Sequence, residues 1–499
     1  MKKKVIIVGI DGGTFTLIDR FIEEGKLPFF KFLKENSIYS YMDSVEQDTR
    51  VPISPTIWTS LATGKKAEKH KILSFFNLQQ DIVSARWFEI LNHYGYSVGT
   101  FGWELTWPPE NYGGFTIPCS MARDNRTFPS YLSPIMELRG KKKGNLLKNI
   151  FLFFKLKKIG VDFLTLTQLS SNMLVEKFYD KKLKLFKRLI FLNRINLSLF
   201  LNLVKNFKTD VSFFFIPLSD SAAHYFWKYS DRENFPEVSD EERKKYGDFL
   251  LKAYIEIDNS LRTIYENNKN SSLFIISDHG MKPIREGSFK TLSLKQKSFL
   301  EKTNILGKVE IYFVGLNSVI VVKENSGLDP ENLIGFFKNI IIKPSGERFF
   351  EVVEKDESGR IFLKVTQFDK GKFKEEDLSN LKVLIGTDYF DFLSLVDVND
   401  IERSADHDKT GIFMIYDKGL KFKGNIGNST IYDFLPSLLS FLNLPLAKDF
   451  DGKPLYKFSE TTMIDSYDFL VKRKKEEVKV DDEFVKEELR RLGYLKDRE

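Results

Sequence analysis

Three apolar runs of the chain end abruptly in polar residues, and this recurrence constrains the fold more than any other feature. The runs are KVIIVGID at 4–11, DVSFFFIPLSD at 210–220 and SSLFIISDHG at 271–280. A helical pattern, YGDFLLKAYIEIDNSLRTIYENN, separates the last two. Strands that alternate with helices are typical of a mostly parallel sheet. The predicted fold class is therefore α/β, with a mostly parallel central sheet and helices on both faces.

The loop after the first run, VGIDGGT, has two interpretations that give Asp11 different roles. It could be the first phosphate loop of an actin-like or sugar-kinase ATPase, or it could present a metal-binding carboxylate. Such an ATPase would continue in an antiparallel strand with period-two alternation. Here Leu17 and Phe21, and Ile18 and Ile22, are four apart, which indicates a helix. In an open α/β sheet, ligands bind at the carboxyl ends of strands, where Asp11 is expected. The ATPase interpretation is weakened but stays open on this motif alone.

Composition limits the size, compartment and metal chemistry. The 499 residues are enough for one large α/β domain with insertions, or for two to three domains. One cysteine, Cys119, rules out an internal disulfide and a cysteine-cluster metal site, and it predicts a reducing, cytoplasmic location. The first apolar run is too short for a secretory signal, and no stretch reaches the roughly 18 apolar residues of a membrane span.

Two stretches depart from the α/β pattern and predict insertions. Residues 139–188 contain 14 Lys or Arg and 3 Asp or Glu, a formal charge of +11, whereas the whole chain carries +7. A solvated helical cap is the simpler interpretation, and peripheral contact with an anionic membrane is the sharper hypothesis. Because the basicity is local, no nucleic-acid polymer is expected as a partner. From Thr291 to about Ser404, short β-like runs broken by glycine and charge clusters predict an α+β subdomain.

These textures predict a division of the chain into six parts. The catalytic core is interrupted twice and is followed by a charged tail. The parts are the core at 1–124, a basic helical cap at 125–208, the core again at 209–290, the α+β subdomain at 291–404, the core at 405–460 and a helical tail at 461–499.

Aspartates and histidines recur where strands are expected to end. Asp220 and His224 are four apart, so a helix beginning after the strand would place both on one face. Asp278 and His279 are adjacent after an apolar strand, and His407 stands in SADHDKTGIF before another. One such pair alone is usually a loop feature or a helix cap. With the aspartate of the first loop they make three aspartates and three histidines, enough for two metal sites, and these ligands suit zinc and, less strongly, manganese.

A candidate nucleophile lies in VPISPTIWTSLATG. Ser54 precedes Pro55, and this pair is the N-cap and first-turn signature of a helix carrying Ile57, Trp58 and Leu61. The serine could serve only as that cap. The free amides and dipole of a helix start also attract phosphate, and a nearby metal would favour the serine alkoxide as an attacking group.

In their order along the chain, these motifs resemble the type I phosphodiesterase and nucleotide pyrophosphatase branch of the alkaline phosphatase superfamily. The matching segments are GIDGGT, PISPTIWTSLATG, SDSAAH, SDHG and ADH. The likeness continues through EKHKI, WELTWPPENYGG, TIYDFLPSLLSFLNLPLAKDFDGKPL and ELRRLGYL, and it is loosest in the two inserts. The resemblance implies an alkaline phosphatase-like fold and an enzyme that acts on phosphate esters.

The resemblance also implies roles for individual residues. One metal would be surrounded by Asp11, Ser54, Asp278 and His279, and the other would be held by Asp220, His224 and His407. Counting back from Thr63-Gly64 aligns Ser54, rather than Thr56, with a nucleophile that is more often Thr in the family. Nucleotide pyrophosphatases have a phosphoryl-binding Asn where this chain has Phe75. The nearby Asn77 is the substitute candidate for substrate binding, and the departure weakens the case for nucleotide substrates.

The predicted function is a two-metal phosphodiesterase that forms a phosphoseryl intermediate at Ser54. A monoesterase, a phosphomutase, and a phosphotransferase acting on lipid or glycan head groups remain alternatives within the superfamily. A sulfatase is disfavoured because no cysteine precedes a Pro-x-Arg at the nucleophile position. From another class, the alternative is a noncatalytic module whose basic insert binds anionic surfaces. The actin-like ATPase ranks last, because it has no use for DHG and two further Asp-His groupings.

Overall fold

The computed structural model of the chain describes most of the core and much of the subdomain. It covers residues 2–44, 54–72, 77–138, 152, 154–160, 179–284, 290–314, 317–323, 325–355, 359–366, 378–400, 404–460 and 462–473. Residues 139–151, 153 and 161–178 of the predicted basic cap, and the predicted charged tail after Arg473, lie outside these residues. Of the helices in the described part, none has the length and apolar character needed to cross a membrane.

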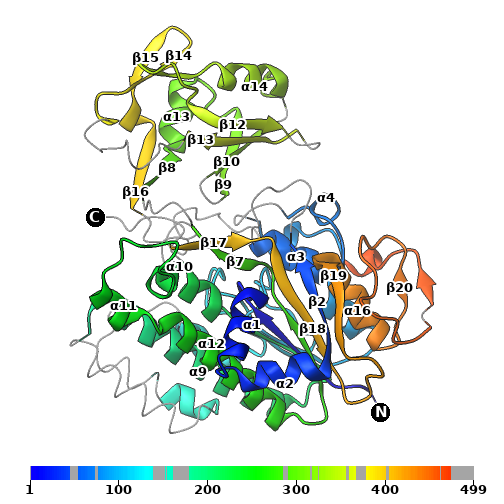
Figure 1. The fold of residues 1–499 in the computed structure, drawn as a ribbon. Coiled ribbons are helices and arrows are strands. Elements are labelled where there is room, and N and C mark those ends of the chain that lie inside the picture. The colour runs from blue at the N-terminus through cyan, green and yellow to red at the C-terminus, as the bar shows by residue number, and fades with distance from the viewer. Residues whose placement is uncertain are drawn as a thin grey trace.

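An eight-stranded sheet organises the core (Figure 1), in the order β19-β2-β18-β6-β1-β5-β3-β4. The strands are β1 (Val5–Ile10), β2 (Ser37–Asp43), β3 (Val98–Phe101), β4 (Gly113–Ile117), β5 (Val211–Ile216), β6 (Ser272–Ile276), β18 (Thr410–Tyr416) and β19 (Gly424–Thr430). The run from β6 to β4 is parallel throughout. Strand β18 enters antiparallel between β6 and β2. The mostly parallel α/β sheet predicted from the sequence is therefore confirmed.

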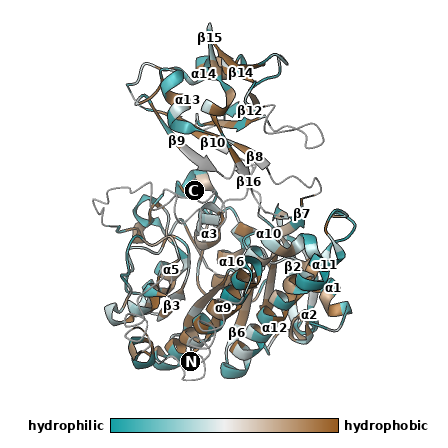
Figure 2. Ribbon diagram, turned by 90° about the vertical axis from the view of Figure 1, so that its left-hand side faces the viewer, coloured by the Kyte–Doolittle hydropathy of each residue, from teal (hydrophilic) through white to brown (hydrophobic). Residues whose placement is uncertain are grey.

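Helices cover both faces of this sheet because its central strands are apolar on both sides. Along β1, Ile6, Val8 and Ile10 pack in one core cluster, whereas Val5 and Ile7 pack in the other. Figure 2 shows this apolar interior between the helical layers. The first cluster takes side chains from α1 (Phe15–Glu23), α2 (Pro28–Asn36), α9 (Lys181–Phe207), α10 (Leu218–Ser230), α11 (Asp240–Tyr246) and α12 (Phe249–Asn267), and the second from α3 (Ser54–Thr63), α5 (Trp87–His93) and α16 (Phe434–Phe441).

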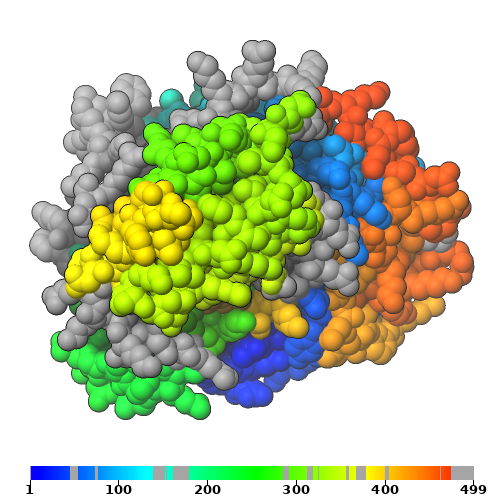
Figure 3. Space-filling model, turned by 90° about the horizontal axis from the view of Figure 1, so that it is seen from above, coloured from blue at the N-terminus to red at the C-terminus, as the bar shows by residue number. Residues whose placement is uncertain are grey.

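The predicted α+β subdomain rises above the carboxyl edge of the sheet (Figures 1 and 3). It has its own apolar cluster and a four-stranded sheet in the order β12-β13-β10-β9. Its elements are β8 (Lys290–Leu294), α13 (Gln296–Lys302), β9 (Val309–Val314), β10 (Asn317–Val322), α14 (Pro330–Lys338), β11 (Ile341–Lys343), β12 (Phe350–Lys355), β13 (Ile361–Val365), β14 (Lys382–Ile385), β15 (Asp388–Asp391), η5 (Phe392–Ser394) and β16 (Val396–Asp400).

The chain enters and leaves the subdomain side by side. Strand β7 (Gly280–Pro283) pairs antiparallel with β17 (Ala405–Asp408), and β8 pairs antiparallel with β16. The residues just before β7 and those within β17 therefore lie beside one another at the base of the subdomain. The remaining short elements are α4 (Ala67–His70), η1 (Gln79–Asp81), η2 (Ser130–Leu132), α6 (Pro134–Glu137), η6 (Ile431–Asp433), β20 (Leu446–Ala447), β21 (Met463–Ile464) and η7 (Asp468–Leu470).

Helix α3 rests on the central strand through a tryptophan. Trp58 is fully buried, and its ring packs against Gly9 of β1 and edge-on against Phe213 of β5. A Cβ atom on Gly9 would lie 2.6 Å from Cη2 of Trp58 and 2.8 Å from the Phe213 ring. Glycine at this position therefore lets the helix approach the strand closely.

Replacing this glycine should weaken the core. Gly9→Ala forces the two rings apart, so we expect the free energy of unfolding to fall by about 1–3 kcal/mol, as in other overpacked cores. Urea unfolding measures the change. Gly335→Ala is the matched control, because Gly335 lies in α14 with no atom within 4 Å of the added Cβ, and helix propensity there predicts a gain of up to about 1 kcal/mol. Equal stability of Gly9→Ala and the wild type would contradict this account of the contact.

Candidate metal centre

The loop after β1 and the start of α10 are joined at Asp11. Its backbone N–H donates to the carbonyl of Ile216 at 3.0 Å, and its own carbonyl accepts from the N–H of Asp220 at 3.0 Å and from Oγ of Ser219 at 2.5 Å. Gly12 has a φ of +67°, which favours glycine, and its Cα faces the backbone of Asp220. These contacts bring two aspartates together from adjacent strand ends.

Helix α10 places Asp220 and His224 one turn apart, as their spacing predicts. Nε2 of His224 lies 3.0 Å from Oδ1 of Asp220. Nε2 of His407 lies 3.4 Å from the same carboxylate oxygen. His407 belongs to β17, where it pairs with Met281 of β7. The three side chains can place one ligand atom each within 4.8 Å of the others, so they form a candidate site for a cation.

The turn between β6 and β7 supplies the next ligands. Nε2 of His279 lies 3.4 Å from Oδ1 of Asp11 and 3.5 Å from Oδ2 of Asp278. The His279 ring stacks on His407 with centroids 3.7 Å apart. A second group that could hold an ion is formed by Asp11, Asp220 and His279. The two groups therefore share Asp220, whereas the resemblance assigns Asp278 to the set with Asp11.

Hydrogen bonds on the far side of two imidazoles determine which nitrogen faces the site. Nδ1 of His224 is 2.7 Å from the carbonyl of Ala405, and Nδ1 of His279 is 2.9 Å from that of Gly280. A carbonyl only accepts, so each Nδ1 carries a proton and donates it, and each Nε2 faces the carboxylates. Metal-ligating histidines have this arrangement.

Buried polar atoms in the cluster fit a cation. Within the described residues, Oδ1 of Asp11, both carboxylate oxygens of Asp278 and Nε2 of His279 are buried and make no hydrogen bond. Burial without compensation is costly for charged groups, and buried charges are normally paired or coordinate metals. The oxygen and imidazole donors suit divalent ions such as zinc and manganese.

The pKa shifts in the cluster favour the binding of positive charge. Burial raises the pKa of Asp11 well above its usual range, and the charges of Asp278, Asp220 and Glu104 raise it further. Burial also lowers the pKa of His279, which keeps the ring neutral. Burial raises the pKa of Asp220 too. His224 and His407 outweigh this effect and hold the pKa of Asp220 well below its usual range.

The hydroxyl candidates differ in accessibility. Ser54 is the first residue of α3 and is 9% exposed, whereas Thr56 is completely buried. Because Ser54 and Trp58 are one turn apart, the contact of Trp58 with Gly9 turns the face of Ser54 toward β1, whose next loop carries Asp11. The side-chain amide of Asn77 donates to Asp81 at 3.4 Å, and its proposed role in substrate binding stays a prediction.

Two buried or charged residues that bear on the site or on helix α3 were not singled out from the sequence. Glu104 follows β3 and contributes negative charge to the environment of Asp11, and its signal is its place in WELTW after a strand. His70 is fully buried; its Nδ1 accepts from the N–H of Ile72 at 3.1 Å, so Nε2 carries the proton and donates to Oγ of Ser60 in α3 at 2.9 Å. His70 thus ties the helix of Ser54 to the segment that follows it.

Carboxylates and imidazoles gathered at the strand ends of an open α/β sheet are typical of a metal-dependent hydrolase. The family model for type I phosphodiesterase / nucleotide pyrophosphatase matches residues 5–356. The chain belongs to this family and is a hydrolase of the phosphodiesterase and pyrophosphatase type. Divalent metal dependence is general in this family.

Other comparisons add only distant similarity. No curated protein matches the sequence. Among solved structures, murine ectonucleotide pyrophosphatase / phosphodiesterase 5 is similar with 12% identity and a TM-score of 0.42, over 88% of this chain and 95% of that one. An inactive variant of the same murine protein in complex with AMP is similar with 13% identity and a TM-score of 0.42, over 89% of this chain and 95% of that one.

The buried His70 makes stability depend on pH. Burial, with a smaller effect of Lys65, lowers its pKa from 6.5 to about 3. Between these values the unfolded chain binds more protons, so the stability is fully present above pH 6.5 and is lost as the pH falls toward 3. Relative to His70→Gln, the wild type should lose about 1.4 kcal/mol of unfolding free energy per pH unit below 6.5.

Urea unfolding between pH 7.5 and 5 tests this, with metal chelated in every sample. The exposed His93 provides the matched control as His93→Gln. Parallel pH profiles for the wild type and His70→Gln would contradict a buried, neutral histidine.

Proposed function

We propose that the chain is a two-metal phosphodiesterase in which Ser54 is the covalent nucleophile. The observation that carries the proposal is the convergence of Asp11, Asp220, His224, His279 and His407 in two overlapping ligand groups. Asp278, with two buried oxygens that make no hydrogen bond among the described residues, completes the acidic side. Zinc is the favoured ion and manganese the alternative, since half of these six side chains are imidazoles.

The chemistry requires charge neutralisation that one serine does not provide. Bound divalent cations would neutralise charge on phosphoryl oxygens and lower the pKa of a nearby hydroxyl. In the first step, Oγ of Ser54 attacks phosphorus, the bond to the leaving alcohol breaks, and a phosphoseryl ester forms. In the second step, water attacks the phosphorus and the Ser54 hydroxyl is restored. The start of α3 assists both steps, because its free amides and dipole stabilise an anionic group.

The proposed location and partners rest on cysteine content and local charge. The single cysteine supports a reducing compartment, and we propose a cytoplasmic enzyme. The +11 charge of residues 139–188 supports peripheral contact with anionic lipid. The partner at the metal centre is a phosphate ester.

Ser54→Ala should separate nucleophilic attack from metal binding. Removal of the hydroxyl leaves the six Asp and His side chains in place, so the variant should fold, keep most of its metal and lose at least about a hundredfold in kcat on an aryl phosphodiester. Ser54→Thr should stay partly active, because it restores a hydroxyl. Thr56→Ala is the matched control and should be much milder. An inactive Thr56→Ala beside an active Ser54→Ala would mean that the other hydroxyl is the nucleophile.

A further inference from the structure

A second concave site lies on the carboxyl side of the sheet, away from the metal centre. It is a cavity of about 860 Å³ lined by the connection between β3 and β4, by the chain after β4, by η1 and by residues 472 and 473. Strand β4 is two places from β5 and three from β1. At about 4.8 Å per strand, β4 therefore lies roughly 10–15 Å from β5 and β1, whose carboxyl ends carry Asp220 and Asp11. Ligand sites are typically of this size.

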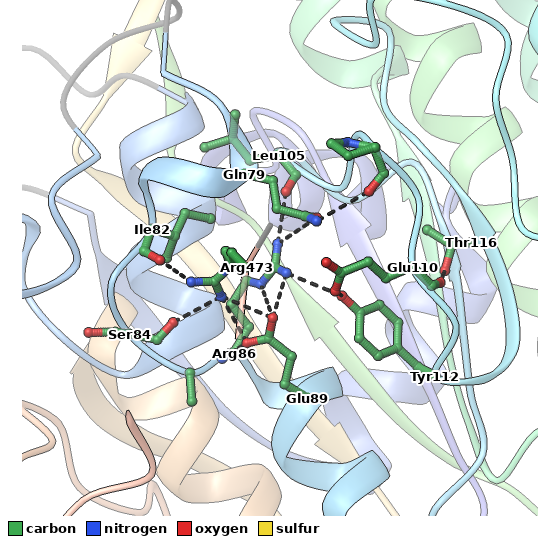
Figure 4. Close-up of polar contacts among 12 residues, drawn as sticks. Gln79, Ile82, Ser84, Arg86, Glu89, Leu105, Glu110, Tyr112, Thr116 and Arg473 are labelled. Atoms are coloured by element: carbon green, nitrogen blue, oxygen red, sulfur yellow. Dashed lines mark hydrogen bonds and ion pairs between the residues drawn. The ribbon is translucent and has the colours of Figure 1, made fainter. Parts of the chain in front are cut away.

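A buried ion-pair network includes the lining residue Arg473 and contacts the lining residue Gln79 (Figure 4). Arg86 is 1% exposed and donates to Oε1 of Glu89 at 2.6 Å, while Nη2 of Arg473 donates to both oxygens of the same carboxylate at 2.9 Å. Arg86 also donates to the hydroxyl of Tyr112 and to Oε1 of Gln79. The Glu89 carboxylate lies between both guanidinium groups, and it holds Arg473 in the cavity wall.

The carboxylates at the rim have hydrogen-bond partners as well. Asp124 accepts from Nε of Arg126 at 2.7 Å and from the indole N–H of Trp107 at 2.8 Å. Glu110 accepts from the hydroxyl of Tyr112 at 2.7 Å. A second anionic group of a substrate would have to compete with Asp124 for Arg126 and with Glu89 for Arg473, and the remaining cation of the lining is the solvent-exposed Lys472. Much of the remaining lining consists of amides and hydroxyls, from Gln80, Asn125, Ser130 and Ser133.

We propose that this cavity is a substrate subsite for a neutral, hydroxyl-rich group, such as a glycosyl or polyol unit, that is esterified to the phosphate attacked at the metal centre. Hydroxyls both donate and accept, and amides and serine hydroxyls offer both kinds of partner. The paired network stays intact when such a group binds, because no counterion is needed. The inference rests on the proposed function for turnover, but binding in the cavity can be measured without it.

The kinetic test compares 4-nitrophenyl phosphodiesters whose second alcohol is glucose, glycerol, a nucleoside or phenol. For the wild type we expect kcat/KM for the glucose or glycerol diester to exceed that for the phenyl diester by at least about tenfold. This is the change expected from one strong hydrogen bond to the substrate. Ser133→Trp, which places a large apolar side chain in the cavity, and Gln80→Leu should abolish this preference and leave the phenyl diester within about twofold of the wild-type value. Asn267→Leu is the matched control, because Asn267 lines a different cavity, at the amino ends of β1, β5 and β6.

Calorimetric titration with methyl α-glucoside and with glycerol tests the cavity itself. The wild type and Ser54→Ala should bind at least one of them, and Ser133→Trp should bind neither. Equal kcat/KM for all four diesters, or a preference that survives Ser133→Trp, would overturn the inference while leaving the phosphodiesterase intact. Binding without any Ser54-dependent hydrolysis would support the cavity and overturn the proposed function. Absence of binding by the wild type would overturn the subsite.

Discussion

Repulsion among buried carboxylates is the constraint on which the site depends. Asp11, Asp220 and Asp278 come from the ends of three adjacent parallel strands, and burial together with the neighbouring charges raises the pKa of Asp11. Two imidazoles turn their Nε2 atoms toward these oxygens because backbone carbonyls hold Nδ1. Such a cluster is electrostatically unfavourable alone and favourable around cations. The sheet order and the ladder between β7 and β17 maintain it.

The fold was largely predictable because its central strands are buried on both faces. Such strands form continuous apolar runs, so β1, β5 and β6 and the polar residues after them stand out in the sequence. The antiparallel insertion of β18 between β6 and β2 was not predictable in this way, because strand order depends on pairings between distant segments. The subdomain was predictable because short β-like runs, broken by glycine and charge clusters, replace the α/β pattern there. The basic segment 139–188 lies largely outside the described residues, and its contact with lipid stays a prediction.

In the candidate site too, features set by local sequence were predictable and features set by distant contacts were not. Spacing predicted that Asp220 and His224 share a helical face, and the DHG turn was recognisable from its place after a strand. The sharing of Asp220 between two ligand groups depends on three-dimensional distances, as does the charge that Glu104 adds near Asp11. The network of Arg86, Glu89 and Arg473 joins residues more than 380 positions apart in the chain, and no local pattern marks such a contact.

The number of bound ions tests the central claim most directly. Purified chain is stripped with a chelator, reconstituted with zinc, freed of excess metal and analysed for metal per protein. The account predicts close to two ions per chain for the wild type and close to one for His224→Ala, whose ring belongs to only one of the two ligand groups. A wild-type value of one or none would contradict a two-metal centre built from these six side chains.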